Sequence, residues 1–320
     1  MIMKFILIFI LQFICYSQEK NIFPKDAILI KLFGEGYFTE GPAQGPDDCI
    51  YFSDLTFTEE TEMQAGVIWK YDLKTDQAFV YRSPSSMANG IEFNSHGEMI
   101  ICEGADFGGR KISITDLNTG KSKILAGLFM KYPFNSPNDL VIDTMGSIYF
   151  TDPRYIGYEN IEQPVMGVYK IDKDRSVQLI ISDIPMPNGI TISPGQKKLY
   201  VGCNFEGNEE NKPLMAIYKC QLDEKANVIS KEIFINYLDG SGPDGITIDS
   251  EGNIYVAVRH EINPCIKVYN VEGKEIDSFK LPEVPSNLTF GRGLYSNILF
   301  ITAGGCLYKI KTTAQGFFSI

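Results

Sequence analysis

Short apolar segments alternate with polar turns along almost the whole chain. Within the segments, apolar and polar residues alternate with a period of two, as in residues 89–93 and 138–142. That period is typical of half-buried β-strands, and the glycine-containing turns between segments favour hairpins. No long apolar stretch repeats every 3.6 residues, so the pattern disfavours an α/β fold.

One unit of this pattern occurs six times. In each unit a polar residue opens an alternating strand, a turn follows, and a second strand rich in Ile, Tyr, Phe and Val comes next. The opening residues are Glu40, Asn89, Asn138, Asn188, Asp244 and Asn287. Third strands are predicted at 66–71, 167–171 and 215–219, and fourth strands at 78–81 and 178–181. Four strands per unit of roughly 40 to 50 residues predict an all-β, six-bladed β-propeller, closed by a strand within residues 27–33.

The N-terminus predicts export. Residues 1–17 hold one lysine, an apolar run and small residues at Cys15 and Ser17, which is the pattern of a secretory signal peptide. About a dozen apolar residues are too few to cross a hydrocarbon core about 30 Å thick, so a membrane anchor is disfavoured. We therefore expect a signal peptide at 1–17, one propeller domain at 18–320, and an exported protein without membrane contact after the signal is removed.

Composition narrows the chemistry. The chain has 320 residues, with 29 Lys plus Arg against 40 Asp plus Glu, and the formal net charge of −11 argues against nucleic-acid binding. Only two histidines are present, which nearly excludes a histidine-based zinc site. Most cysteines beyond the signal lie in apolar strands and are expected to be buried thiols, with Cys203 and Cys220 as the pair to check.

The six opening residues are the best candidates for chemistry. In a propeller the innermost strands begin at the mouth of the central channel, so these side chains should converge there. All six offer oxygen, and carboxylates combined with amides suit Ca²⁺ or Mg²⁺. The alternative is that Asn or Asp before Gly forms turns that cap each strand.

A second set of acidic residues follows the openers. Asp54, Glu103 and Asp152 each stand 14 residues beyond the opener of their unit, at the end of a predicted second strand. Two interpretations remain open, because these carboxylates would either rim the channel or start the next loop.

Several stretches carry a family resemblance. They are PFNSPNDLVIDTMGSIYFTDPRYIG, MPNGITISPGQKKLYV, SGPDGITIDSEGNIYVAV and MANGIEFNSHGEMIICEG. The chain resembles the SMP-30/gluconolactonase/LRE-like family over nearly all of residues 18–320, and the gluconolactonase-type members most closely. The resemblance implies a six-bladed propeller that binds one divalent metal, often calcium. Many such proteins hydrolyse sugar lactones, and relatives cleave organophosphates.

The resemblance also implies a site. It gives Glu40, Asn188 and Asp244 as metal ligands, with Asn138 as a fourth ligand or a substrate contact. It gives Asp244 as the catalytic acid/base, and we also expect substrate contacts from Asn89 and Glu103. Ca²⁺ is the expected metal, with Mg²⁺, Mn²⁺ or Zn²⁺ as alternatives. The stretch EGADFGGR after Cys102 departs from many lactonase-type members because it lacks a histidine, which leaves substrate preference open.

The sequence therefore predicts an exported, metal-dependent hydrolase that opens a sugar lactone, a small-molecule substrate. One alternative is an aryl-ester or phosphotriester hydrolase using the same metal. Another is a propeller that only binds a partner. We expect a monomer or a weak homo-oligomer.

Overall fold

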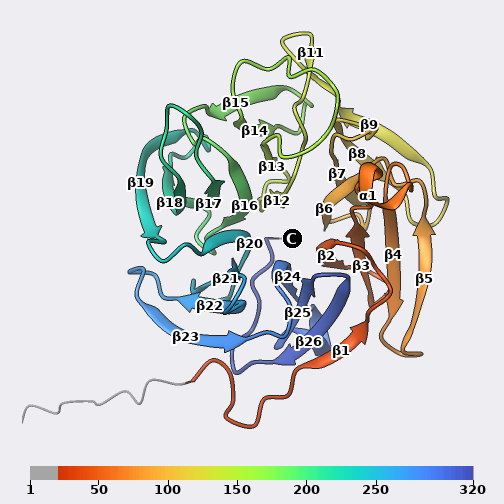
Figure 1. The fold of residues 1–320 in the computed structure, drawn as a ribbon, viewed down its shortest axis with the longest axis vertical. Helices are drawn as coiled ribbons and strands as arrows, with labels where there is room; N and C mark the ends of the chain where they lie inside the picture. Colours follow the sequence, from red (N-terminus) through yellow and green to blue (C-terminus); the bar gives the residue numbers. More distant parts are fainter. Residues whose placement is uncertain (1–20, 320) are drawn as a thin grey trace, which may run out of the picture.

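The structure, a computed structural model, describes residues 21–319. Six four-stranded antiparallel sheets stand around a central channel (Figure 1), which confirms the predicted six-bladed β-propeller. The predicted signal peptide, residues 1–17, lies outside the described residues. Among residues 21–319, no helix is long and apolar enough to span a membrane.

Each blade is a meander whose first strand lies innermost, next to the channel. Blades 1 and 2 contain β2 (Thr39–Gln44), β3 (Cys49–Asp54), β4 (Val67–Asp72), β5 (Gln77–Arg82), β6 (Ala88–Phe93), β7 (Met99–Glu103), β8 (Lys111–Thr115) and β9 (Ser122–Ala126). Blades 3 and 4 contain β12 (Leu140–Ile142), β13 (Ile148–Asp152), β14 (Gly167–Ile171), β15 (Val177–Ile181), β16 (Pro187–Ile192), β17 (Lys198–Phe205), β18 (Leu214–Leu222) and β19 (Val228–Asn236). Blade 5 contains β20 (Gly242–Ile248), β21 (Ile254–Arg259), β22 (Cys265–Tyr269) and β23 (Glu275–Lys280).

The sixth blade joins the two ends of the chain. Its strands β24 (Pro285–Phe290), β25 (Ile298–Ala303) and β26 (Cys306–Lys311) are completed by β1 (Ile30–Phe33), which pairs antiparallel with β26. The closing strand predicted within residues 27–33 is therefore confirmed. This closure leaves no open end in the ring, so the blades hold the channel walls in fixed positions.

Few other elements occur among the described residues. A small hairpin, β10 (Leu128–Phe129) with β11 (Tyr132–Pro133), follows blade 2. The short helix α1 (Thr58–Thr61) lies in the connection between β3 and β4, and a 3₁₀ turn (Gly293–Tyr295) lies between β24 and β25.

The hydrophobic core lies between neighbouring blades. Tyr255 of blade 5 meets Phe290 of blade 6 edge to face at 4.9 Å, and Phe150 stacks on Tyr169 within blade 3 at 5.4 Å. All six cysteines of the described chain are free thiols, and five of them are buried. Many of the Tyr and Phe rings are buried in this core, where they pack between neighbouring sheets.

The inner strands do not run as regular ladders. Pairing shifts register near the opener in blades 1, 2, 4, 5 and 6, for example between Glu40 and Ala43 and between Pro187 and Ile190. Such bulges turn the local side chains, here toward the channel.

The glycine after an opener allows the blades to approach each other. A Cβ at Gly41 would lie 2.1 Å from the carbonyl oxygen of Asn89 in the next blade, and one at Gly189 would lie 2.2 Å from that of Asp244. Glu40, Asn188 and Asp244 lie inside strands rather than in turns. The opener–glycine pairs therefore serve the close packing of the inner strands instead of capping them.

Candidate functional site

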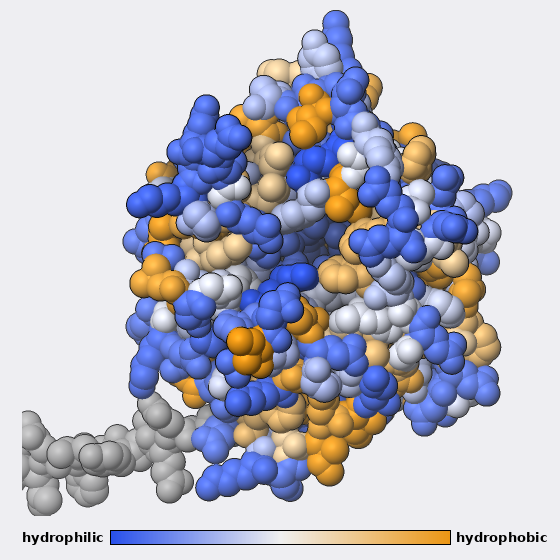
Figure 2. Space-filling model, in the orientation of Figure 1, coloured by the Kyte–Doolittle hydropathy of each residue, from blue (hydrophilic) through white to orange (hydrophobic). Residues whose placement is uncertain are grey.

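A cavity of about 250 Å³ lies at one end of the channel. Among the residues that line it are five of the predicted site residues: Glu40, Asn89, Asn138, Asn188 and Asp244. They come from the inner edges of blades 1 to 5, so the ring brings together residues about 200 positions apart in the sequence. Figure 2 shows the centre of this face as a hollow.

Glu40 is buried in a strongly anionic setting. Its Oε2 accepts hydrogen bonds from the Gly41 amide at 2.9 Å and from Asn287 Nδ2 at 3.1 Å. Burial raises the pKa of Glu40 well above its usual range, and the negative charges of Asp244 and Asp139 raise it further. No cation of this chain is paired with the Glu40 carboxylate in the described structure, so a bound cation would relieve this repulsion.

Asp244 has a partner that the sequence analysis did not identify. Its Oδ2 lies 2.8 Å from Nη1 of Arg259, whose guanidinium also lies 5.5 Å from the ring centre of Phe38. Burial raises the pKa of Asp244, and Arg259 and Asn188 oppose that rise. The guanidinium thus favours the ionised carboxylate, the form that can bind a cation or take a proton.

The three asparagines present amide oxygens to the same cavity. The Asn188 amide nitrogen donates to the Tyr155 hydroxyl at 3.1 Å, which leaves its carbonyl oxygen for another partner. The Oδ1 of Asn89 is buried without a hydrogen-bond donor. Buried polar atoms are normally paired, so an unpaired oxygen on a residue that lines this cavity indicates a ligand-binding role.

The donor set fits a hard divalent cation. Glu40 and Asp244 supply carboxylates, Asn138 and Asn188 supply amide oxygens, and the excess negative charge is buried. Residues 21–319 contain no group of three or more His, Cys, Asp or Glu arranged to hold a metal. The candidate site therefore depends on amide oxygens beside two carboxylates, a combination that suits Ca²⁺ better than zinc.

Glu103 does not line the cavity. Its carboxylate is buried between Arg82 and Lys111, each at 2.8 Å, and accepts a hydrogen bond from Ser113 at 2.6 Å. The structure thus pairs Glu103 with Lys111 of its own blade and with Arg82 of blade 1, and the predicted substrate contact stays a prediction.

Asp54 and Asp152 fix the segment that leads into the first strand of their own blade. Asp54 accepts the backbone N–H of Tyr37 and of Phe38, both at 2.9 Å, and Asp152 accepts that of Ser136 at 2.7 Å. Phe38 and Ser136 line the cavity, each two residues before an opener. These two aspartates therefore hold residues of the cavity wall in place without lining the cavity themselves.

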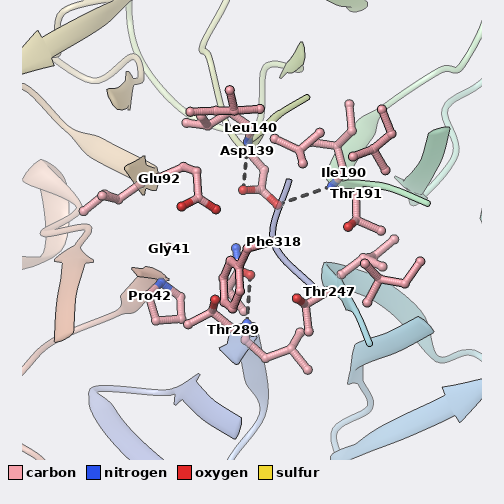
Figure 3. A pocket seen from close by; sticks show the side chains of 18 of the residues that line it. Gly41, Pro42, Glu92, Asp139, Leu140, Ile190, Thr191, Thr247, Thr289 and Phe318 are labelled. Atoms are coloured by element: carbon pink, nitrogen blue, oxygen red, sulfur yellow. Dashed lines mark hydrogen bonds between the residues drawn. The ribbon is translucent and has the colours of Figure 1, made fainter. Parts of the chain in front are cut away.

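The channel continues beneath the cavity and ends at the C-terminal segment. Figure 3 shows Glu92, Asp139, Thr191, Thr247 and Thr289 around this space, with the ring of Phe318 inside it. That ring lies 4.1 Å from the guanidinium carbon of Arg292. Burial raises the pKa of Asp139 to about 7, although its oxygens accept the N–H groups of Leu140 and Ile190. The tail closes the channel at the end away from the cavity.

Sequence reasoning missed Arg259, Tyr155 and Asp139. Arg259 stands 15 residues beyond Asp244, at the end of β21 and one residue past the place of Asp54 and Asp152 in their units, so the repeat did not single it out. Asp139 takes the place of the glycine that follows Asn89 and Asn188. Tyr155 lies in a loop without any repeat signal.

Comparisons with known proteins agree with this fold. The model of the family described as SMP-30/Gluconolactonase/LRE-like region matches residues 38–305. A gluconolactonase of Zymomonas mobilis is 29% identical over 251 residues, which cover 74% of this chain and 65% of that relative. The matched region thus spans just under two thirds of that relative's length.

Two solved structures share the architecture. A gluconolactonase of Xanthomonas campestris is 24% identical, with a TM-score of 0.78 over 91% of both chains. A calcium-binding protein, regucalcin, of Agrobacterium tumefaciens is 19% identical, with a TM-score of 0.73 over 93% of this chain and 97% of that one. At these identities the likeness shows the propeller fold.

Proposed function

The chain belongs to the SMP-30/gluconolactonase/LRE-like family, and from this premise we propose that it is a hydrolase that opens lactone rings. The gluconolactonase relative supports the reaction class. The observation that carries the proposal is the convergence of Glu40, Asn138, Asn188 and Asp244 on one cavity. A propeller that only binds a partner has no need for two buried carboxylates at its channel mouth.

The cavity would hold one divalent cation, with Ca²⁺ as the first candidate. Glu40, Asn188 and Asp244 would bind it, and Asn138 would either complete the set or contact the substrate. When bound, such a cation polarises a carbonyl oxygen as a Lewis acid.

The side chains around the cation would supply the remaining chemistry. As a general base, Asp244 takes a proton from a water molecule whose oxygen forms the new bond to the lactone carbonyl carbon. The ring C–O bond then breaks, and the ring oxygen receives a proton to give a hydroxy acid. A direct attack by the Asp244 carboxylate is the second route, and both require the ionised form that Arg259 favours.

Chelation tests the metal requirement. Purified protein treated with EDTA and then dialysed should lose lactone hydrolysis, and added Ca²⁺ should restore it. Parallel additions of Mg²⁺, Mn²⁺ and Zn²⁺ would rank the metals. Hydrolysis that is indifferent to the chelator would remove the metal mechanism.

Two further points remain proposals. The sequence predicts that the substrate is a sugar-derived lactone. A screen of lactones that carry different substituents on the ring tests this prediction. Export is supported by the pattern of residues 1–17. Sequencing the N-terminus of the protein recovered outside the cytoplasm should find cleavage near Ser17, and an intact Met1 would contradict it.

A further inference from the structure

The apolar residues of the cavity are confined to blades 1 to 3, whereas its polar residues come from all five blades that line it. We name the apolar side the apolar wall. It consists of Phe38, Leu55, Phe57, Met87, Ala105 and Ile156. All six belong to the first three blades, next to the ends of β2, β3, β6, β7 and the loop after β13. The cavity residues from blades 4 and 5 are polar, namely Asn188, Asn204, Glu206, Asp244 and Arg259, and blades 1 to 3 add the polar Glu40, Asn89, Ser136, Asn138 and Tyr155.

The aromatic part of the apolar wall is held in place by several contacts. The rings of Phe38 and Phe57 lie 5.5 Å apart, and Tyr37 meets Phe57 edge to face at 5.8 Å. Next to Phe57, the Thr58 amide donates to Asp106 of blade 2 at 2.9 Å. These contacts tie the blade 1 connection to blade 2, so the aromatic surface is built in advance of any ligand.

Two residues of the apolar wall, Met87 and Ala105, come from blade 2. Met87 is almost completely buried and has a φ of 54°, a left-handed conformation that costs energy for a residue with a side chain. Its carbonyl oxygen accepts the Gly104 amide at 2.7 Å, and the Ala105 amide donates to Ser136 at 2.9 Å. These hydrogen bonds hold the strained backbone at Met87, whose side chain lines the cavity.

This distribution of apolar and polar residues should make the cavity bind some lactones better than others. A ring with hydroxyl groups on every side would place some of them against the apolar wall, whose six side chains contain no oxygen or nitrogen, and each hydroxyl left unpaired weakens binding. An alkyl or aryl group in the same place would be removed from water. The ester group would then face the polar side, where Asp244 and Arg259 lie.

We propose that the substrate is a lactone with an alkyl or aryl substituent, which packs on the apolar wall while the ring ester faces Asp244. This inference rests on the proposed lactone hydrolysis and adds the substrate class. It separates this chain from an enzyme for fully hydroxylated sugar lactones.

A series of lactones tests the substrate class. With calcium-loaded protein, kcat/KM would be measured for γ-butyrolactone, γ-hexanolactone, γ-nonalactone, dihydrocoumarin and glucono-1,5-lactone. We expect kcat/KM to rise about fourfold for each of the first methylenes, the equivalent of about 0.8 kcal/mol per buried CH₂, and to be lowest for the gluconolactone. A flat series with gluconolactone fastest would overturn this inference and leave lactone hydrolysis standing. Failure to open any lactone would overturn both.

A variant of Phe57 tests whether the apolar wall causes the preference for longer alkyl substituents. Phe57→Ser should lower the ratio of the γ-nonalactone to the γ-butyrolactone kcat/KM by about tenfold, and Phe57→Leu should largely keep it. The ratio does not depend on the folded fraction, so weaker stability of Phe57→Ser does not affect the result. Phe79→Ser is the control, since Phe79 lies half-exposed on the outer strand β5. An unchanged ratio in Phe57→Ser would overturn the proposal.

Discussion

Arg259 and Asp244 form an ion pair across the end of blade 5, with 2.8 Å between Nη1 and Oδ2. The Asp244 side chain is 5% exposed and that of Arg259 is 36% exposed. A cation provided by the chain itself therefore stands beside the carboxylate assigned to both metal binding and proton transfer. Such a charge favours the ionised form of Asp244, and it also repels a second cation.

Arg259→Met should make calcium binding tighter. The positive charge next to Asp244 is lost while the bulk of the side chain is kept, so we expect the Kd for Ca²⁺ to fall about three- to tenfold. Titration calorimetry on the metal-depleted protein measures it directly. Weaker calcium binding in this variant would show that Arg259 serves mainly to orient Asp244.

Glu103→Gln should lower stability without changing substrate binding. The change leaves Arg82 and Lys111 without their shared carboxylate, and we expect the free energy of unfolding to fall by about 1–3 kcal/mol. Chemical denaturation measures this. Glu232→Gln, which breaks the largely exposed pair with Lys219, should cost less than about 1 kcal/mol. A changed KM with unchanged stability would instead favour the substrate contact predicted from the sequence.

Asp152 should make the protein less stable as pH rises. Burial raises the pKa of Asp152 to about 7, although the Asn135 and Ser136 amides oppose the rise. In the unfolded chain the Asp152 carboxyl ionises near pH 4. Its contribution to the free energy of unfolding is therefore complete below that pH, and it falls by up to about 1.4 kcal/mol per pH unit as the pH rises to about 7. The free energy of unfolding of Asp152→Asn should fall less steeply between pH 4.5 and 7. The exposed Asp26→Asn should keep the wild-type slope, and equal slopes in all three proteins would contradict the account.

Gly316→Ala should dislodge the tail that closes the channel. A Cβ at Gly316 would lie 2.2 Å from Cβ of Phe290, and the Gly316 amide donates to Ser296 at 2.8 Å. We expect the free energy of unfolding to fall by about 1–3 kcal/mol. Gly195→Ala, with nothing within 4 Å of the added atom, is the matched control and should change stability little. Equal stability of the two variants would show that the tail adapts freely.

The sequence predicted the architecture because the repeated pattern has the period of strands and occurs six times. It predicted Glu40, Asn138, Asn188 and Asp244 as one site because openers of propeller blades meet at one channel. The register shifts near Glu40, Asn188 and Asp244 could not be read from the sequence, since they depend on pairing between strands.

Other features of the site needed coordinates for similar reasons. Glu103 has the same place in its unit as Asp54, but Lys111 approaches it only through pairing of β7 with β8, and Arg82 only through packing of blade 1 on blade 2. The apolar wall joins residues of three blades that no short motif connects. Glycine after an opener suggested a turn, whereas the close approach of neighbouring blades is what requires it.

Hydrolysis by Asp244→Asn tests the central claim most directly. The variant keeps the shape of the side chain but has no carboxylate, so it loses a proton acceptor and a charged metal ligand together. We predict that kcat/KM for the best lactone falls by at least about 10²-fold while circular dichroism and thermal unfolding show a folded protein. Turnover within about tenfold of the wild type in a folded variant would contradict the role assigned to Asp244 and the site built around it.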